Sequence, residues 1–310
     1  MNDPTVWITG IASESPPHQI LPENLETLVA KFYDIERPGI KKLLAISRST
    51  GAIQFYDDDK PGLLALSTLS PIHYMDDAFR RTVVDLNVKS AITHTIAVSC
   101  TNLGSPGYDL LVVQKLGLKD DDDRMLLHGV GCAKGVAQVQ DTNDVGIAAA
   151  LFSDSAAAFV ICNEFALEAK DKAIHQLIES TTTFVPGTSD LMSFLFCTTE
   201  FRTTLTRQMV HHIKAAVAPM FRKLVPIFER KTNQKSYDAV DFDWALHTGG
   251  KATINGIPRK HGHLQRSLAS YQIHLLNQRQ SIWRVNVLAT AFGPGLLIEM
   301  AMLRRCRKVA

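Results

Sequence analysis

Two residues of this 310-residue chain have the types and settings that nucleophilic catalysis requires. Cys132 lies among small residues, in the run 126–135, immediately before a predicted helix over residues 133–140. Backbone N–H groups and the positive end of a helix dipole lower the pKa of a thiol at such a position and favour its thiolate. His247 follows an apolar stretch and begins a loop of small residues. A cysteine and a distant histidine that meet in the folded chain would be a nucleophile and its base.

Taken alone, each residue also has a simpler interpretation. A single cysteine is usually a small core residue, and we expect this of the other four, which are Cys100, Cys162, Cys197 and Cys306. The odd number and scattered positions of the cysteines argue against a disulfide framework and indicate a reducing, cytoplasmic compartment.

Composition excludes several classes of protein. Hydrophobic residues make up 45% and charged residues 21%, values typical of a soluble globular protein. The formal net charge of +2 gives no reason to expect nucleic acid or a membrane surface as a partner. We see no CxxC pair or HExxH helix that would predict a metal site, no signal peptide, and no apolar run of membrane-spanning length.

Strand-like and helix-like segments alternate along the chain, which predicts an α/β layered fold. A break near residues 163–175 divides the chain into halves, 1–165 and 166–310. The predicted strands are residues 6–11, 92–98, 156–162, 283–291 and 296–302. The predicted helices are residues 25–32, 40–46, 76–86, 106–116, 133–140 and 205–230, the last of them bent at Pro219 and Pro226.

Four motifs in order resemble the type III polyketide synthases, the chalcone synthase-like family, and its fungal branch in particular. Gly131–Gly135 resembles the nucleophile loop of that family. Leu151–Ala158 resembles its loop-and-strand segment, in which Phe, Gly or Ser, Asp, and Gly or Ser are followed by alanines. His247–Gly250 resembles the histidine loop, and Phe292–Leu296 resembles the closing Gly-Pro-Gly loop. Each motif is weak by itself, but four in the right order identify the family.

The resemblance implies a fold and a reaction. The fold is thiolase-like, with two βαβ-type halves in αβαβα layers, the cysteine in the first half and the histidine and closing loops in the second. The protein would be a homodimer without a permanently bound cofactor or metal. Its substrates would be an acyl-CoA starter and malonyl-CoA, whose decarboxylative condensation gives a polyketide of pyrone or resorcinol type.

The resemblance also implies a role for single residues. Cys132 would carry the acyl group, and His247 would pair with its thiolate and then donate a hydrogen bond to the thioester carbonyl. The substrate-binding residues would be Cys100 and Thr101 in the starter pocket, Phe194 as gatekeeper, Gly249 and Gly250 along the pantetheine arm, and Gly293 and Pro294 in the cavity wall. Arg48 would meet a coenzyme A phosphate, unless it is an ordinary surface arginine; Phe194, likewise, has core packing as its alternative.

The chain departs from the family pattern in two places. No Gly-Asn-x-Ser-Ser motif follows His247, which lies only 46 positions before Gly293, and Asn277 has the wrong neighbours to replace it. Only 22 positions separate Cys132 from Asp154, which leaves no room for the strand and dimer-interface loop of the family. We therefore expect both halves of the fold to be incomplete, and loss of one oxyanion donor to slow condensation by about 10²–10³-fold.

Three functions therefore stay open from the sequence, ahead of a fourth, a cysteine hydrolase, because nothing here resembles the sequence around a protease cysteine. The first is a working type III polyketide synthase. The second is an impaired homologue that acts as a dimer partner or acyl-CoA binder. The third is a ketoacyl-acyl carrier protein synthase-like enzyme of the same fold, which would prefer an acyl carrier protein as donor.

Overall fold

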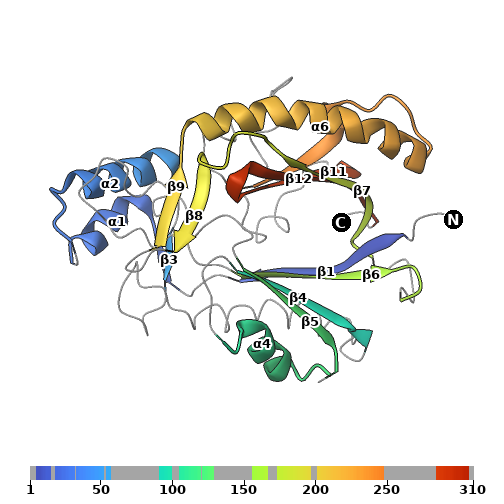
Figure 1. Ribbon diagram of the computed structural model, residues 1–310, viewed down its shortest axis with the longest axis horizontal. Coiled ribbons are helices and arrows are strands. Elements are labelled where there is room, and N and C mark those ends of the chain that lie inside the picture. Colours follow the sequence, from blue (N-terminus) through green and yellow to red (C-terminus); the bar gives the residue numbers. More distant parts are fainter. Residues whose placement is uncertain are drawn as a thin grey trace.

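The computed structural model describes most of the chain as helices and strands connected by turns (Figure 1). The described residues are 5–14, 18–31, 33–51, 54–56, 91–99, 105–119, 121–128, 156–166, 173–196, 201–247 and 284–306. The strands are β1 (Val6–Glu14), β2 (His18–Ile20), β3 (Gln54–Tyr56), β4 (His94–Ser99), β5 (Asp123–His128), β6 (Ala156–Asn163), β7 (His175–Phe184), β8 (Met192–Phe196), β9 (Phe201–Leu205), β10 (Phe242–Leu246), β11 (Asn286–Gly293) and β12 (Leu297–Arg305). The helices are α1 (Pro22–Val29), α2 (Pro38–Thr50), α4 (Tyr108–Leu116) and α6 (Gln208–Thr232), with 3₁₀ turns η3 (Ala239–Asp241) and η6 (Pro294–Leu296).

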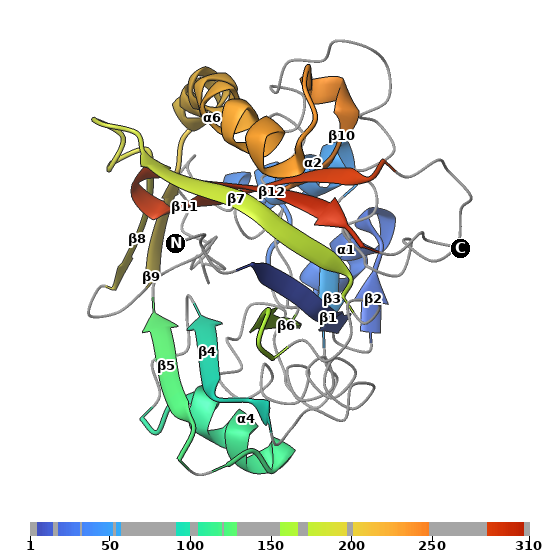
Figure 2. The same ribbon diagram turned by 90° about the vertical axis from the view of Figure 1, so that its right-hand side faces the viewer.

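Six of these strands form one mixed sheet in the order β10-β11-β12-β7-β1-β6. The β10–β11 pair is parallel, and every other neighbouring pair in this sheet is antiparallel. The strands β4 and β5 form a separate parallel pair, and β2–β3 and β8–β9 form antiparallel pairs. Helix α6 covers the C-terminal strands on one side of the molecule, and α4 lies beside β4 and β5 on the other (Figures 1 and 2).

The largest core lies between α6 and the C-terminal strands. The buried residues of α6 recur every three or four positions, so that one apolar stripe faces the sheet; they are Met209, Ile213, Val217, Met220, Leu224 and Phe228. The helix ends at Asn233, which has a left-handed backbone conformation (φ 52°). No helix in the described ranges has both the length and the apolar character that crossing a membrane demands.

This packing predicts which substitutions destabilise the fold. Leu288 in β11 is completely buried in the core under α6. We expect Leu288→Ala to lower the free energy of unfolding by about 2–5 kcal/mol, because it removes buried methyl groups and leaves a cavity. Urea unfolding measures the change. Val285→Ala is the matched control, since Val285 is 52% exposed and should change stability by only about 0.5 kcal/mol; similar losses for both variants would contradict this packing.

Smaller clusters stabilise the outlying elements. Helices α1 and α2 pack through Leu25, Val29, Ile40 and Leu44. Helix α4 packs on the β4–β5 pair through a second set, Ala97, Tyr108, Val112, Val113, Leu116 and Leu118. These two clusters are separate from the core under α6. In the described part of the fold, three apolar clusters therefore pack the helices: one between α1 and α2, one between α4 and the β4–β5 pair, and one between α6 and the C-terminal strands.

The predicted elements agree with the observed ones in type and differ at their ends. The predicted helix over 205–230 is observed at Gln208–Thr232, with both prolines inside it. The predicted strands at 283–291 and 296–302 are observed at Asn286–Gly293 and Leu297–Arg305, where pairing with β10 and β7 sets their bounds. The helices predicted over 76–86 and 133–140 lie outside the described residues.

Candidate active site

His247 lies directly after β10, at the carboxyl end of the parallel β10–β11 pair. Its backbone N–H donates to the carbonyl oxygen of Thr290 at 2.9 Å, so that the ladder continues one residue beyond the strand. Its ring meets the ring of Phe292 edge to face, with centroids 5.7 Å apart and an interplanar angle of 84°. Both the main chain and the ring of His247 are therefore fixed by β11.

The side chain of His247 is partly buried, and one of its ring nitrogens lacks a hydrogen-bond partner among the described residues. Its Nε2 is shielded from solvent and has no hydrogen-bond partner among the described residues. Burial lowers the pKa of His247 to about 4, so the ring is neutral at pH 7. A neutral imidazole can accept a proton or donate one hydrogen bond, depending on its tautomer, and both roles suit acyl transfer.

A second partly buried histidine adds to the pH dependence of stability. His175, in β7, also has its pKa lowered to about 4, first by burial and then by the positive charge of Arg305. Because the unfolded chain binds protons near pH 6.5 and the folded chain near pH 4, the unfolded state gains protons first as the pH falls. Stability should therefore decrease between pH 6.5 and pH 4, by up to about 3 kcal/mol from His247.

Urea unfolding at pH 7 and pH 5 measures this decrease. In a variant carrying both His175→Gln and His247→Gln, the difference between the two pH values should shrink. An unchanged difference in that variant would show that other groups cause the pH dependence.

The closing turn lies at the same end of the sheet. Strand β11 ends at Gly293, η6 follows, and β12 returns antiparallel. The turn is bonded to the loop after β7, since the Val185 N–H donates to the Leu296 carbonyl at 3.2 Å. The buried Thr188 hydroxyl lies 2.5 Å from the Val185 carbonyl and 3.2 Å from the Gly295 carbonyl.

Gly295, rather than Gly293, is the glycine that the backbone of this turn requires. Gly295 has φ +66°, and a Cβ there would approach the Phe184 ring to 3.0 Å. Gly293 is extended (φ −124°), and a Cβ there would meet Leu297 Cβ at an ordinary 3.7 Å. The Gly-Pro-Gly motif contains both, but the sequence interpretation selected Gly293 and Pro294 and omitted Gly295.

This difference gives a matched pair of variants. Gly295→Ala should destabilise the protein by about 1–2 kcal/mol, because residues with a Cβ are disfavoured in the left-handed region. Gly293→Ala, at an extended position, should cost less. Thermal unfolding of the two variants compares them, and an equal or larger loss for Gly293→Ala would refute the assignment.

Arg48 lies away from this histidine and this turn, on α2. Its guanidinium pairs with the carboxylate of Glu26 in α1, and its side chain is 53% exposed. The ion pair gives Arg48 a structural role in the α1–α2 unit. Its predicted contact with a coenzyme A phosphate stays a prediction.

The remaining predicted site residues are described only in part. Phe194 is in β8, opposite Thr203 of β9, and its side chain is outside the described part. Five more predicted residues lie outside the described ranges, namely Cys100, Thr101, Cys132, Gly249 and Gly250. The structure thus brings together His247 and the closing turn, and adds Thr290 and Phe292, which the sequence interpretation did not select for the site.

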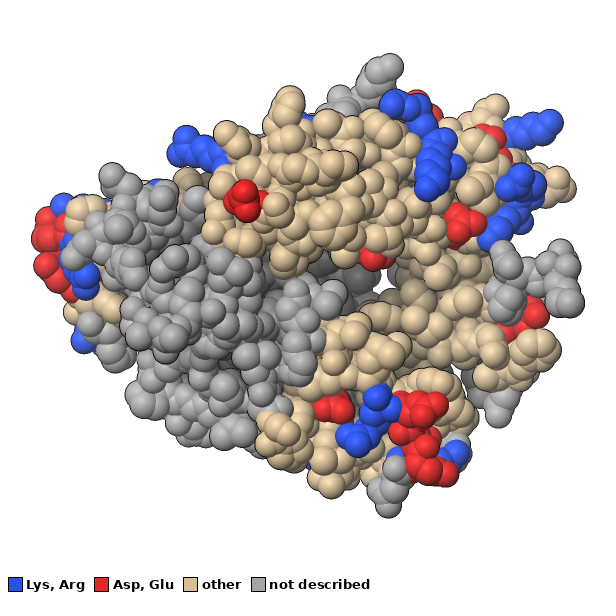
Figure 3. Space-filling view, viewed as in Figure 1, with Lys and Arg blue, Asp and Glu red and all other residues tan. Residues whose placement is uncertain are grey.

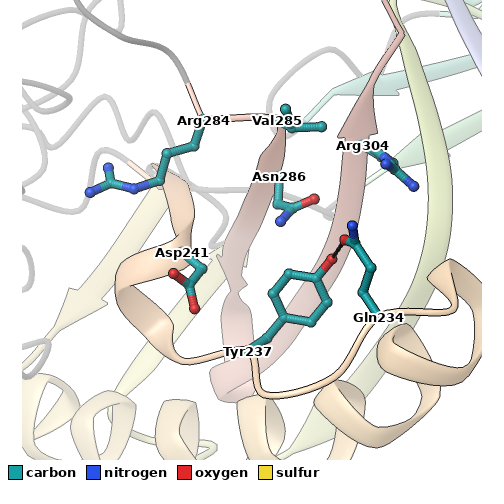
Figure 4. Close-up of a pocket in the computed structure, with 7 residues that line it drawn as sticks. All are labelled: Gln234, Tyr237, Asp241, Arg284, Val285, Asn286 and Arg304. Atoms are coloured by element: carbon teal, nitrogen blue, oxygen red, sulfur yellow. Dashed lines mark hydrogen bonds between the residues drawn. The ribbon is translucent and has the colours of Figure 1, made fainter.

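A hollow of about 420 Å³ lies at the opposite end of the same strands (Figure 4). Its lining comes from the residues before β10, the start of β11 and the end of β12; these are Gln234, Tyr237, Asp241, Arg284, Val285, Asn286 and Arg304. Tyr237 donates its hydroxyl hydrogen to Gln234 across one side. Because the hollow is at the amino end of β10 and β11, it is separate from the end that carries His247.

Comparison with known proteins shows the family to which this chain is similar. Residues 82–166 match the family described as chalcone and stilbene synthases, N-terminal domain. The chain is 37% identical over 388 aligned residues to the type III polyketide synthase pspB of Penicillium soppii, covering 98% of this chain and 97% of that protein. It is 26% identical to the acylalkylpyrone synthase csyB of Aspergillus oryzae, covering 81% of this chain and 77% of that protein.

The solved structures agree in fold. A type III pentaketide synthase from Neurospora crassa superimposes with a TM-score of 0.78 at 23% identity, covering 97% of this chain and 99% of that one. The complex of CsyB with CoA-SH superimposes with a TM-score of 0.81 at 23% identity, covering 97% and 100% of the two chains. These likenesses confirm the predicted thiolase-like α/β fold.

The comparison with the Penicillium soppii protein also bears on chain length. The 388 aligned positions exceed the 310 residues of this chain, although both proteins are aligned almost from end to end. That relative therefore carries internal residues that have no counterpart here. At 37% identity over nearly the whole length, this chain belongs to the type III polyketide synthases, a family of acyltransferases.

Proposed function

We propose that this chain loads an acyl group from an acyl-CoA onto Cys132 and extends it with malonyl-CoA to a polyketide of pyrone or resorcinol type. The observation that carries the proposal is the placement of His247, with a buried and unpartnered Nε2 beside Phe292 and the closing turn. The substrate class is supported by the relatives, one of which is an acylalkylpyrone synthase and one a structure with CoA-SH bound.

In the loading step the sulfur of Cys132 attacks the thioester carbonyl carbon. A new carbon–sulfur bond forms, the bond to the coenzyme A sulfur breaks, and coenzyme A leaves as a thiolate that takes up a proton. His247 would remove the proton of the Cys132 thiol and hydrogen-bond the carbonyl oxygen as negative charge develops there.

In the extension step malonyl-CoA loses carbon dioxide, and the electron pair of the broken carbon–carbon bond stays on the acetyl carbon as an enolate. The enolate attacks the thioester carbonyl on Cys132, which regenerates the thiolate. Neutral His247 has one N–H, which would donate to the enolate oxygen. In this chain no Gly-Asn-x-Ser-Ser motif follows His247 to supply a second donor.

The remaining predicted residues would bind the substrate. Gly249 and Gly250 would let the pantetheine arm approach the backbone, and Cys100 and Thr101 would line the starter pocket. Phe194 would separate that pocket from the coenzyme A tunnel. Arg48 could bind a phosphate with the exposed part of its guanidinium while it keeps its ion pair with Glu26.

We also propose two halves, 1–165 and 166–310, and a homodimer. The antiparallel pairing of β7 with β1 joins the two halves over Val6–Ile8 and His175–Leu177. This pairing would fix how the half with Cys132 faces the half with His247.

Product analysis tests the proposal. The purified chain is incubated with a long-chain acyl-CoA and malonyl-CoA, beside the Penicillium soppii enzyme as control, and products are separated by chromatography. We expect a polyketide at a rate about 10²–10³-fold below the control, because one oxyanion donor is lost. Free fatty acid as sole product, in equal amounts from Cys132→Ala, would contradict the proposal, and a preference for acyl carrier protein donors would favour the ketoacyl synthase alternative.

The shorter internal length of this chain favours one second candidate, an acyl-CoA binder or dimer partner that does not condense. Acyl loading without any polyketide would support it. Mixing the chain with the Penicillium soppii enzyme would then show whether mixed dimers form and change the product.

A further inference from the structure

The hollow at the amino end of β10 and β11 lies where the sheet face under α6 changes from apolar to polar. Strands β11 and β12 pair across this face, and Leu288 and Met302, which lie opposite each other, are completely buried in the core under α6. Asn286 and Arg304 form the next pair whose side chains point to the same face. Both line the hollow (Figure 4). A polar pair therefore replaces an apolar one where the core under α6 ends.

Asn286 presents a buried amide to the hollow. It is 8% exposed, and its side-chain amide has no hydrogen-bond partner in the described part of the chain. In Figure 4 the amide points toward Tyr237 and Gln234, which are hydrogen-bonded to each other. Burial of an unbonded amide is unfavourable, and buried polar groups are nearly always bonded to protein, water or a ligand. The amide of Asn286 is therefore positioned to bond a group that occupies the hollow.

The two arginines of the lining differ in their partners. The Arg284 guanidinium donates to Oδ1 of Asp243 at 3.3 Å, and its side chain extends away from the other lining residues (Figure 4). Arg304 is partly buried, and its side chain forms no ion pair or hydrogen bond with another described residue. A guanidinium presents its N–H donors in a planar fork that matches the two oxygens of a carboxylate. Arg304, beside the Asn286 amide, is thus the cation of the hollow that is available to a ligand.

The charged groups in and directly behind the hollow favour an anion with a single negative charge. Three arginines and two aspartates leave one net positive charge there; they are Arg284, Arg304, Arg305, Asp241 and Asp243. Asp241 lies on the opposite side of Asn286 from Arg304 (Figure 4). Its negative charge opposes a doubly charged phosphate more strongly than a carboxylate.

The surface beside the hollow is basic. Helix α6 ends there with Arg230 and Lys231 in its last turn, and Lys235 follows next to the lining residue Gln234. The space-filling view shows Lys and Arg side chains gathered over this end of α6 (Figure 3). A positive surface raises the local concentration of anions and their rate of association.

Apolar surface borders the polar pair. The ring of Tyr237 packs against Phe228 and Phe242, with ring centroids 5.1 and 5.8 Å apart. Val285, also in the lining, is 52% exposed. The volume of about 420 Å³ is within the range of small-molecule sites. The hollow therefore has space and apolar surface for the carbon skeleton of a small ligand.

From this geometry we propose that the hollow binds the carboxylate of a small organic acid. Arg304 and the Asn286 amide donate hydrogen bonds to the carboxylate oxygens, and the carbon skeleton lies against Tyr237 and Val285. The site is at the opposite end of the strands from His247. It is separate from the proposed polyketide synthesis and does not depend on it.

Calorimetric titration of the full chain with sodium benzoate, at constant ionic strength, tests the ligand class. Benzamide, which has a similar shape without the charge, and inorganic phosphate at pH 8 are the ligand controls. We expect benzoate to bind at least about tenfold more tightly than either, because a charge-assisted hydrogen bond contributes at least that factor. No binding of benzoate, or equally tight binding of benzamide or phosphate, would overturn the proposal.

Three variants locate the bound benzoate. Arg304→Gln removes the charge and should weaken binding at least about tenfold. Arg222→Gln is the matched control, since Arg222 is exposed on α6 outside the lining, and it should leave binding unchanged. Asp241→Asn should strengthen phosphate binding, because it removes the opposing charge. Equal binding by the two arginine variants would refute the site, because the attraction would then be a general effect of positive charge.

Chemical modification of the unmutated chain is the second test, and it needs no variant to fold. Phenylglyoxal modifies accessible arginines, and peptide-level mass spectrometry measures the rate at each one. At a benzoate concentration of ten times Kd, occupancy of the hollow should slow modification of Arg304 by about tenfold, while the rate at Arg222 stays the same. Slowing at both arginines, or at neither, would contradict the proposal.

Discussion

Replacing Cys132 with alanine is expected to abolish acyl loading and to lower coenzyme A release from an acyl-CoA by at least about 10³-fold. The sulfur is the group that forms the covalent bond in the proposed reaction, and alanine has no atom to replace it. Release of coenzyme A, followed with a thiol reagent over one turnover, measures this step directly. The measurement separates loading from the later condensation.

Two other cysteines provide the controls for this variant. Cys162 lies in β6, where burial raises the pKa of its thiol and makes it a poor nucleophile at pH 7. Cys306 is exposed after β12, far along the chain from the nucleophile loop. Cys162→Ala and Cys306→Ala should load the acyl group at the rate of the unmodified chain. If either variant lost loading while Cys132→Ala retained it, the nucleophile would be a cysteine other than Cys132.

Replacing His247 with alanine is the second large expected effect, a loss of about 10²–10⁴-fold in loading. Among the described residues, the partly buried, neutral ring is the one group proposed to transfer protons, and its Nε2 has no hydrogen-bond partner there. Alanine removes both the base and the donor. Glutamine keeps a donor but cannot act as a base, so His247→Gln should recover part of malonyl-CoA decarboxylation while loading stays slow.

His175 is the matched control for this histidine. Its pKa is likewise lowered to about 4, but it lies at the start of β7, opposite Ile8 and Arg305, and it has no part in the proposed reaction. His175→Gln should leave loading unchanged. Equal losses in His175→Gln and His247→Ala would indicate that both substitutions act through stability rather than through chemistry.

The sequence predicted elements whose signal is local. The stripe of apolar residues in α6 and the apolar run that becomes β6 need no knowledge of distant residues. In contrast, β7 pairs with β12 and β1 pairs with β6, and the paired residues are more than a hundred positions apart in the sequence. No periodicity within one strand specifies such a partner. Seven strands were not predicted, namely β2, β3, β5, β7, β8, β9 and β10.

The site shows the same limit. The motif around His247 was found from sequence, but its burial and its contact with Phe292 follow from the closing of β11 onto β10. Likewise the pairing of Arg48 with Glu26 joins two helices and could not be inferred from either helix alone. The choice between Gly293 and Gly295 required backbone angles, which the order of residues does not contain.

The central claim is that Cys132 carries the acyl group, and peptide-level mass spectrometry of the full chain after incubation with a long-chain acyl-CoA tests it most directly. The chain has five cysteines, so each cysteine-containing peptide is scored for the acyl mass. We predict the adduct on the peptide with Cys132 and on none of the other four. An adduct on another cysteine, or folded protein without any adduct, would contradict the account.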